Sequence, residues 1–136
     1  MGTGALLWSC PSFAVGAVAV GIAPGGVIQG FAGGHSVDAA DEKSARAAAI
    51  DGCHKSTGAP KTAQNACHVV QTFKDQCYAI ALDPKDGTPG VGWAVKDTQA
   101  QADEAALELC RKTSPVDRKS FCVVPASNHR CDGTAK

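Results

Sequence analysis

Four histidines, His35, His54, His68 and His129, carry the side chains of this sequence that titrate nearest neutral pH. His35 is followed directly by Ser36, and a base beside a hydroxyl is the pairing that nucleophilic catalysis needs. The pair follows two glycines and precedes an expected helix, so it also suits a loop that leads into a helix cap. Because neighbours in sequence seldom face each other, we expect the loop, and keep His35 and Ser36 as the candidates for a small hydrolase.

His54 and His68 form a second candidate group, because each follows a cysteine, Cys53 and Cys67. Two thiolates and two imidazoles would suit a tetrahedral zinc ion, but this spacing matches no common zinc finger. Two later cysteines of similar spacing are not followed by histidines. We therefore expect surface histidines, with His54 and His68 as the second candidate pair for a hydrolase, and neither a metal nor a cofactor.

Cysteine is abundant in this chain, with seven residues among 136 and no Cys-x-x-Cys motif. Neither a thioredoxin-type redox motif nor a zinc ribbon is therefore present, and disulfides are the expected use of the thiols. Disulfides persist in oxidising compartments, which predicts a secreted or periplasmic protein. The first cysteine, Cys10, is expected to be a free thiol in an N-terminal extension.

An internal repeat organises the sequence. Each half has a small-residue strand pattern, then glycine followed by an aromatic residue, then an alanine-rich helix that ends in cysteine, then a further cysteine before valines. The matched segments are Gly16–Val20 with Tyr78–Leu82, Gly30–Ala32 with Gly92–Ala94, the helix ends at Cys53 and Cys110, and Cys67–Val70 with Cys122–Pro125. We expect one domain over residues 14–131, made of two repeats, 14–76 and 77–131, with a flexible extension over 1–13 and a tail over 132–136.

Each repeat predicts the order β-β-α-β. Helix caps are expected near Asp41 and at Thr98, where Gln101 completes a capping box. The expected strands are 17–22, 27–32 and 69–73 in the first half, and 78–82, 91–95 and 121–124 in the second. The fold class is therefore α+β, a tandem pseudo-symmetric repeat with two helices on an antiparallel sheet, stabilised by disulfides.

The repeat also favours one pairing of the six remaining cysteines. Cys53–Cys67 and Cys110–Cys122 would each join a helix to the strand that follows it, and closing loops of that size stabilises by about 3 kcal/mol each. The third members of the repeat are Cys77 and Cys131, which we expect to pair and to tie the two halves together. Six cysteines allow many other pairings, and the repeat is the only reason to prefer this one.

The aromatic residues Phe31, Tyr78 and Trp93 fall on expected strands, with Phe31 matched to Trp93 by the repeat. Core packing is the ordinary role of such residues. If they stood on an exposed face of the sheet, that face would be a binding surface, since Tyr and Trp dominate interface energetics.

Charge and hydropathy exclude several classes of protein. Thirteen basic and thirteen acidic residues give no net charge, which argues against a nucleic-acid binder. Pro24 and the glycines after it end the first apolar run before it could span a membrane. No basic residue precedes Lys43, so no secretory signal is visible, and the start of the chain resembles a beginning from which an export signal has been removed.

The doubled pattern of Gly-Ala-Val-Ala, glycine before an aromatic, an alanine-rich helix ending in cysteine, and Cys-x-Val resembles the bacterial domain of unknown function 4189 family. The resemblance covers nearly everything from Val15 to Cys131. It implies an exported bacterial protein with a cysteine-stabilised repeated fold, and it supplies neither a reaction nor catalytic residues.

No catalytic constellation stands out among these residues. We therefore expect a secreted or periplasmic bacterial binding module, whose partner is a protein or a component of the cell envelope. The alternative is a small secreted hydrolase with a histidine-containing site.

Overall fold

The computed structural model describes residues 14–136, so the expected extension over 1–13 and Cys10 lie outside the described residues. Strands, helices and 3-10 helices alternate in two similar series. The elements are β1 (Val15–Ile22), η1 (Val27–Gln29), β2 (Phe31–Ala39), α1 (Glu42–His54), α2 (Lys61–Gln64), β3 (His68–Phe73), β4 (Cys77–Leu82), β5 (Val91–Lys96), α3 (Gln99–Thr113), η2 (Val116–Phe121), η3 (Ala126–Asn128) and β6 (His129–Cys131).

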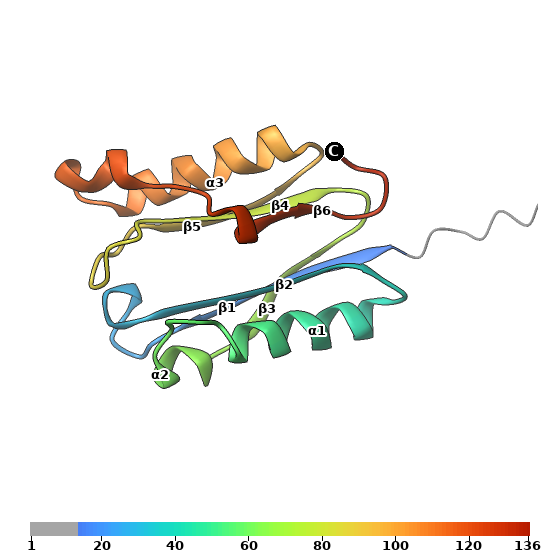
Figure 1. Cartoon of the computed structure of the whole chain (residues 1–136), viewed down its shortest axis with the longest axis horizontal. Helices are drawn as coiled ribbons and strands as arrows, with labels where there is room; N and C mark the ends of the chain where they lie inside the picture. The colour runs from blue at the N-terminus through green and yellow to red at the C-terminus, as the bar shows by residue number, and fades with distance from the viewer. Residues whose placement is uncertain (1–13) are drawn as a thin grey trace, which may run out of the picture.

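The strands form two antiparallel sheets of three strands, ordered β2-β1-β3 and β5-β4-β6. The sheets face each other, α1 and α2 cover the outer face of the first, and α3 covers the outer face of the second (Figure 1). This four-layer arrangement confirms the α+β class and the repeated order of elements. None of the helices within residues 14–136 has the length and apolar character needed to cross a bilayer.

Both expected helix caps are present. The side chain of Asp41 accepts a hydrogen bond from the Ser44 amide at 2.7 Å, and that of Thr98 accepts one from the Gln101 amide at 3.2 Å. Each bond satisfies an amide that the first turn of a helix leaves free, which fixes where α1 and α3 begin.

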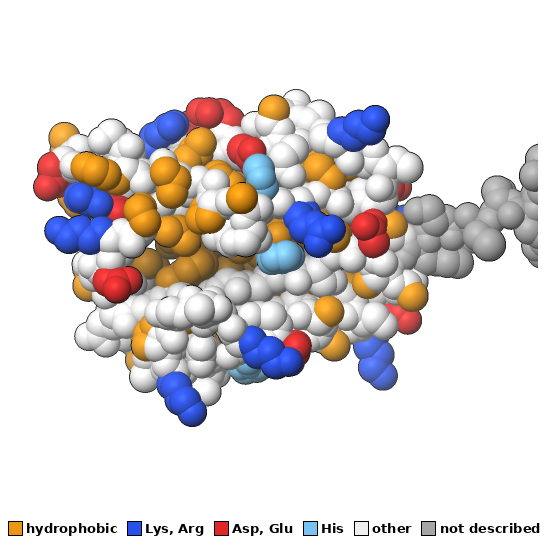
Figure 2. All heavy atoms as spheres, in the orientation of Figure 1, with side chains coloured by type: hydrophobic (Ala, Val, Ile, Leu, Met, Phe, Trp, Pro, Cys, Tyr) orange, Lys and Arg blue, Asp and Glu red, His pale blue; other side chains and the backbone are white. Residues whose placement is uncertain are grey.

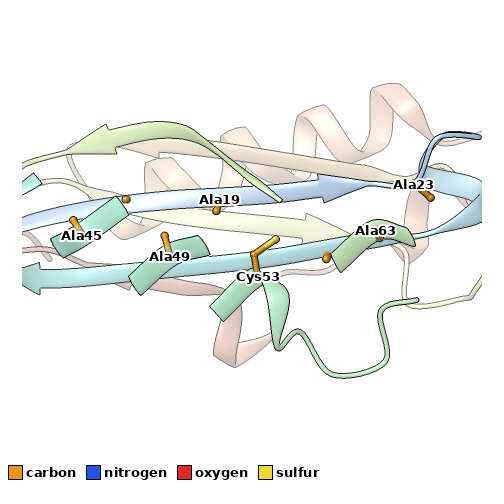
Figure 3. Packing of buried hydrophobic residues seen from close by; sticks show 8 residues of the cluster. Ala19, Ala23, Ala45, Ala49, Cys53 and Ala63 are labelled. Atoms are coloured by element: carbon orange, nitrogen blue, oxygen red, sulfur yellow. The ribbon is translucent and has the colours of Figure 1, made fainter. Parts of the chain in front are cut away.

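Small side chains let each helix lie close to its sheet. Ala45, Ala49 and Cys53 of α1 are fully buried against β1, where Ala17 and Ala19 face them (Figure 3). A corresponding set, Ala102, Ala106 and Cys110 of α3, packs on Ala79 and Ala81 of β4. The alanine-rich composition therefore serves two closely packed helix–sheet layers.

A third cluster fills the space between the sheets. Val18, Val20, Phe73, Tyr78 and Ile80 are buried there, and each lies on the sheet face opposite the helices. The two halves are thus held together by larger side chains than those that hold each helix to its sheet.

The three expected disulfides are present: Cys53–Cys67, Cys77–Cys131 and Cys110–Cys122. The expected role of one pair was wrong. Cys77 and Cys131 lie directly opposite each other on β4 and β6, so this disulfide closes the second sheet and does not tie the halves together.

Two expected strands are corrected by the structure. Residues 27–29 form the 3-10 helix η1, and β2 begins only at Phe31 but continues to Ala39, so the segment around His35 is a strand and not a loop. In the second half, residues 121–124 form no strand. Val123 makes an isolated bridge with Leu82, and Pro125, which has no amide hydrogen to donate, precedes the turn that leads into β6.

The repeat was also aligned in the wrong register over β2. Gly34 pairs with Ala19, and Gly92 pairs with Ala81, so Gly34 is the counterpart of Gly92. His35 is therefore the counterpart of Trp93, and Phe31 is not. The chain needs a glycine at both positions because a Cβ atom would collide with the backbone of the covering helix, at the Ala49 carbonyl oxygen for Gly34 and at the Ala106 carbonyl oxygen for Gly92.

Candidate functional site

His35 and Ser36 project from opposite faces of β2, so they do not form a base–nucleophile pair. His35 pairs with Val18, whose side chain faces the other sheet, whereas Ser36 pairs with Ala17, which faces α1. The Ser36 hydroxyl is buried and has no hydrogen-bond partner among the described residues. The geometry therefore offers this serine no base.

The His35 ring lies between the two sheets and stacks on Tyr78, with ring centroids 4.8 Å apart and an interplanar angle of 27°. Burial lowers the pKa of His35 below its ordinary value of 6.5, and the positive charge of Arg130 lowers it further, while a hydrogen bond with the Ser127 backbone opposes both effects. The ring is thus held in its neutral form.

His54 and His68 are both exposed and both hydrogen-bond to backbone carbonyls. The Nδ1 atom of His54 lies 2.7 Å from the Gln64 oxygen, and that of His68 lies 3.2 Å from the Ala66 oxygen. The adjacent thiols are joined in the Cys53–Cys67 disulfide and are not free to bind zinc. Nowhere within residues 14–136 are three or more His, Cys, Asp or Glu side chains arranged to hold a metal ion.

The aromatic residues do not form an exposed sheet face. Tyr78 is fully buried, and its hydroxyl has no hydrogen-bond partner within the described part of the chain. Phe31 and Trp93 are half-buried and stack across the two halves, with centroids 6.4 Å apart. These three residues join the sheets, which corrects the expectation that they could present a binding surface together.

The sequence analysis did not predict the contact that the structure shows between His129 and Asp103. The Nδ1 atom of His129 lies 3.0 Å from both carboxylate oxygens of Asp103, and Gln99 donates to the same carboxylate at 2.9 Å. The contact joins β6 to α3, far apart in sequence, so no local motif could reveal it. The pair therefore links β6 to α3.

A concave feature lined by both halves lies at one end of the molecule. It is a cleft of about 770 Å³. Figure 2 shows it as a hollow with hydrophobic side chains at its floor. Its walls are the segments 27–33 and 56–60 of the first half, and 82–91 and 125–128 of the second.

The cleft combines apolar and polar groups. Ile28 and Phe31 contribute apolar surface, and Ile28 is 57% exposed. Thr57 and Asn128 contribute polar side chains from opposite walls. The sequence signal for this site was the turn at 83–87, which lines the cleft and which the sequence analysis used only to separate two strands.

One wall of the cleft is fixed by an ion pair. Arg118 donates to both carboxylate oxygens of Asp83, at 2.6 and 2.7 Å, and stacks on the Phe121 ring. These hydrogen bonds lower the pKa of Asp83 to about 2, so the carboxylate stays charged at neutral pH. Lys85 and Asp86 are exposed beside it, which leaves the cleft with nearly balanced charge.

A family model described as Domain of unknown function (DUF4189) matches residues 15–128. No curated protein and no solved structure matches the chain.

Proposed function

The chain belongs to the DUF4189 family, whose function is unknown, and we propose that it is an exported bacterial binding module that holds its partner in the cleft between its two halves. The partner is a segment of a protein or of a cell-envelope component. The alternative, a small secreted hydrolase, has less support because His35 and Ser36 do not face each other.

The observation that carries the proposal is the composition of the cleft walls. Loops from both halves leave Ile28 more than half exposed beside polar side chains such as Thr57 and Asn128. Exposed apolar groups with a few convergent polar groups are typical of binding sites. A partner could bury Ile28 and satisfy the polar groups at once.

The charge of the cleft favours an uncharged or charge-balanced partner. Asp83 is neutralised by Arg118, and Lys85 stands next to Asp86. A polyanion would gain little here, because no cluster of positive charge lines the walls. Peptide-like segments suit such a cleft, because they alternate apolar side chains with backbone hydrogen-bonding groups.

Export is inferred from the disulfides. Three disulfides within 136 residues support a compartment in which thiols are oxidised. In bacteria this compartment is the periplasm or the exterior of the cell. The sulfur atoms then stabilise a domain whose helix–sheet layers bury small side chains.

Site-specific photocross-linking tests the proposal. A benzophenone amino acid replaces Ile28 in the protein directed to the bacterial periplasm, and the cells are irradiated. The matched control position is Val116, which is 87% exposed and does not line the cleft. We expect a discrete adduct from position 28 that position 116 does not give.

A cleft-filling variant separates a specific partner from chance capture. Thr57→Trp adds a large side chain to an exposed position of the wall and leaves the core unchanged. We expect this variant to lose most of the adduct at position 28. Equal adducts at positions 28 and 116, or none at position 28, would overturn the proposal.

A further inference from the structure

His35 occupies the place in the first half that Trp93 occupies in the second. Trp93 stacks on Phe31 across the two halves, and His35 stacks on Tyr78 in the same layer. At these two equivalent positions between the sheets, the Trp93 ring cannot take up a proton and the His35 ring can. The histidine therefore makes one contact between the halves dependent on protonation.

The groups that face the His35 ring come from four elements. Strand β4 presents Tyr78, β6 presents the charged Arg130, β1 presents the apolar Val18, and η3 presents the backbone of Ser127. None of these groups is negatively charged at neutral pH. A protonated ring would have no counter-ion among them and would lie near a second positive charge.

The same ring is close to the cleft. Gly33, two residues before His35 on β2, lines the cleft, and so does Ser127, whose backbone lies near the ring. Phe31, two residues before Gly33 on the same strand, also lines the cleft and stacks on Trp93. A change in how the halves meet at His35 would alter the walls of the cleft.

We propose that His35 is a pH-sensitive latch between the two halves, which at neutral pH holds them in the arrangement that forms the cleft and which releases the bound partner when the compartment acidifies. The release of a partner rests on the proposed function, whereas the latch itself does not.

The direction of the effect follows from the environment of the ring. The pKa of His35 is lowered in the folded protein, so the unfolded or opened chain takes up the proton more readily. The stabilisation is fully present above about pH 6.5 and is lost as the pH falls toward the lowered folded-state pKa. Within that window the equilibrium constant for unfolding rises by up to roughly tenfold per pH unit.

Urea unfolding between about pH 7.5 and pH 5 tests the latch, because only histidines and strongly shifted groups titrate in this range. Trp93 reports the contact between the halves in a Trp8→Phe background, which removes the other tryptophan. We expect the unfolding constant of the protein to rise on acidification. Acrylamide should also quench Trp93 more strongly at the lower pH.

Two variants isolate His35. His35→Phe keeps an aromatic ring on Tyr78 and cannot take up a proton, so we expect the pH response to shrink. Arg130→Gln removes the neighbouring charge from an exposed position, which raises the pKa of His35 and narrows the pH window. The matched control is His129→Gln, on the opposite face of β6, which should keep the full His35 response.

The outcomes distinguish the latch from the proposed function. A response that survives in His35→Phe, or that is absent from the unsubstituted protein, overturns the latch, and adducts at position 28 would still support the cleft. A His35-dependent response without adducts at any pH supports the latch and overturns the binding module. Adducts that fall on acidification only when His35 is present support both.

Discussion

At the scale of single residues, Asp132 connects the two halves that Cys77–Cys131 does not join. Its side chain is fully buried and accepts hydrogen bonds from the amides of Asp38 at 2.7 Å and Asp75 at 3.0 Å. These amides belong to β2 and to the connection between β3 and β4. The carboxylate of Asp38 accepts in return from the Gly133 amide at 2.8 Å, and the Gln99 amide of α3 donates to the Lys136 carbonyl, so the segment expected as a tail contacts both halves.

We expect Asp132→Ala to lower the free energy of unfolding by about 2–4 kcal/mol, because two amides lose a charged acceptor. Urea unfolding of the oxidised protein measures the loss. Asp117→Ala, at an exposed position of η2, is the control and should change stability little. Equal losses in the two variants would contradict this role of Asp132.

At the scale of elements, the distance between α1 and β2 decides whether a larger side chain fits at each glycine between them. A Cβ atom at Gly34 on β2 would lie 2.2 Å from the Cys53 amide nitrogen of α1, and backbone atoms cannot move aside as a side chain can. Gly52 on α1 faces the same strand from farther away, with its nearest neighbour, the Gly34 Cα atom, at 3.7 Å.

We therefore expect opposite results from two alanine substitutions only a few ångströms apart. Gly34→Ala should destabilise the protein by about 3 kcal/mol or more, because the helix must be displaced from the sheet. Gly52→Ala should stabilise it by about 0.5–1 kcal/mol, because alanine favours the helix interior. Thermal unfolding of both variants measures the difference, and a Gly34→Ala protein as stable as Gly52→Ala would refute the close packing of α1 on β2.

At the scale of the whole molecule, each disulfide acts within one half. The Cys77–Cys131 bridge closes a loop of 54 residues, whereas Cys53–Cys67 and Cys110–Cys122 close loops of 14 and 12. The contact between the halves depends instead on the apolar cluster between the sheets and on the Asp132 hydrogen bonds. Figure 1 places the chain segments around Asp132 at the end of the molecule opposite the turns that form the cleft.

When the disulfides are removed one at a time, the loss in free energy of unfolding should increase with the length of the loop that each one closes. We expect the Cys77→Ala, Cys131→Ala double variant to lose about 4 kcal/mol, and each of the other double variants about 3 kcal/mol, because longer loops gain more entropy when released. Urea unfolding of the three double variants ranks them. If the variant without Cys77–Cys131 loses the least free energy of unfolding, this disulfide does not stabilise the protein through chain entropy.

The sequence by itself determined the features that arise within short segments or from their repetition. Asp41 and Thr98 fixed the helix starts because a cap acts within one turn, and the spacing of the cysteines predicted all three disulfides. The α+β class followed from the same repeat. The argument against nucleic-acid binding also came from the sequence alone, because composition and net charge do not depend on contacts between distant residues.

Only the tertiary structure decided how the halves meet. It moved His35 from an expected loop to the layer between the sheets, separated it from Ser36, and brought it onto Tyr78 and near Arg130. It also formed the cleft from turns more than fifty residues apart, and buried Asp132 between two amides. Each of these depends on which face of a strand a residue occupies, and a one-residue change in register exchanges the faces, so only the packing of the two sheets could decide them.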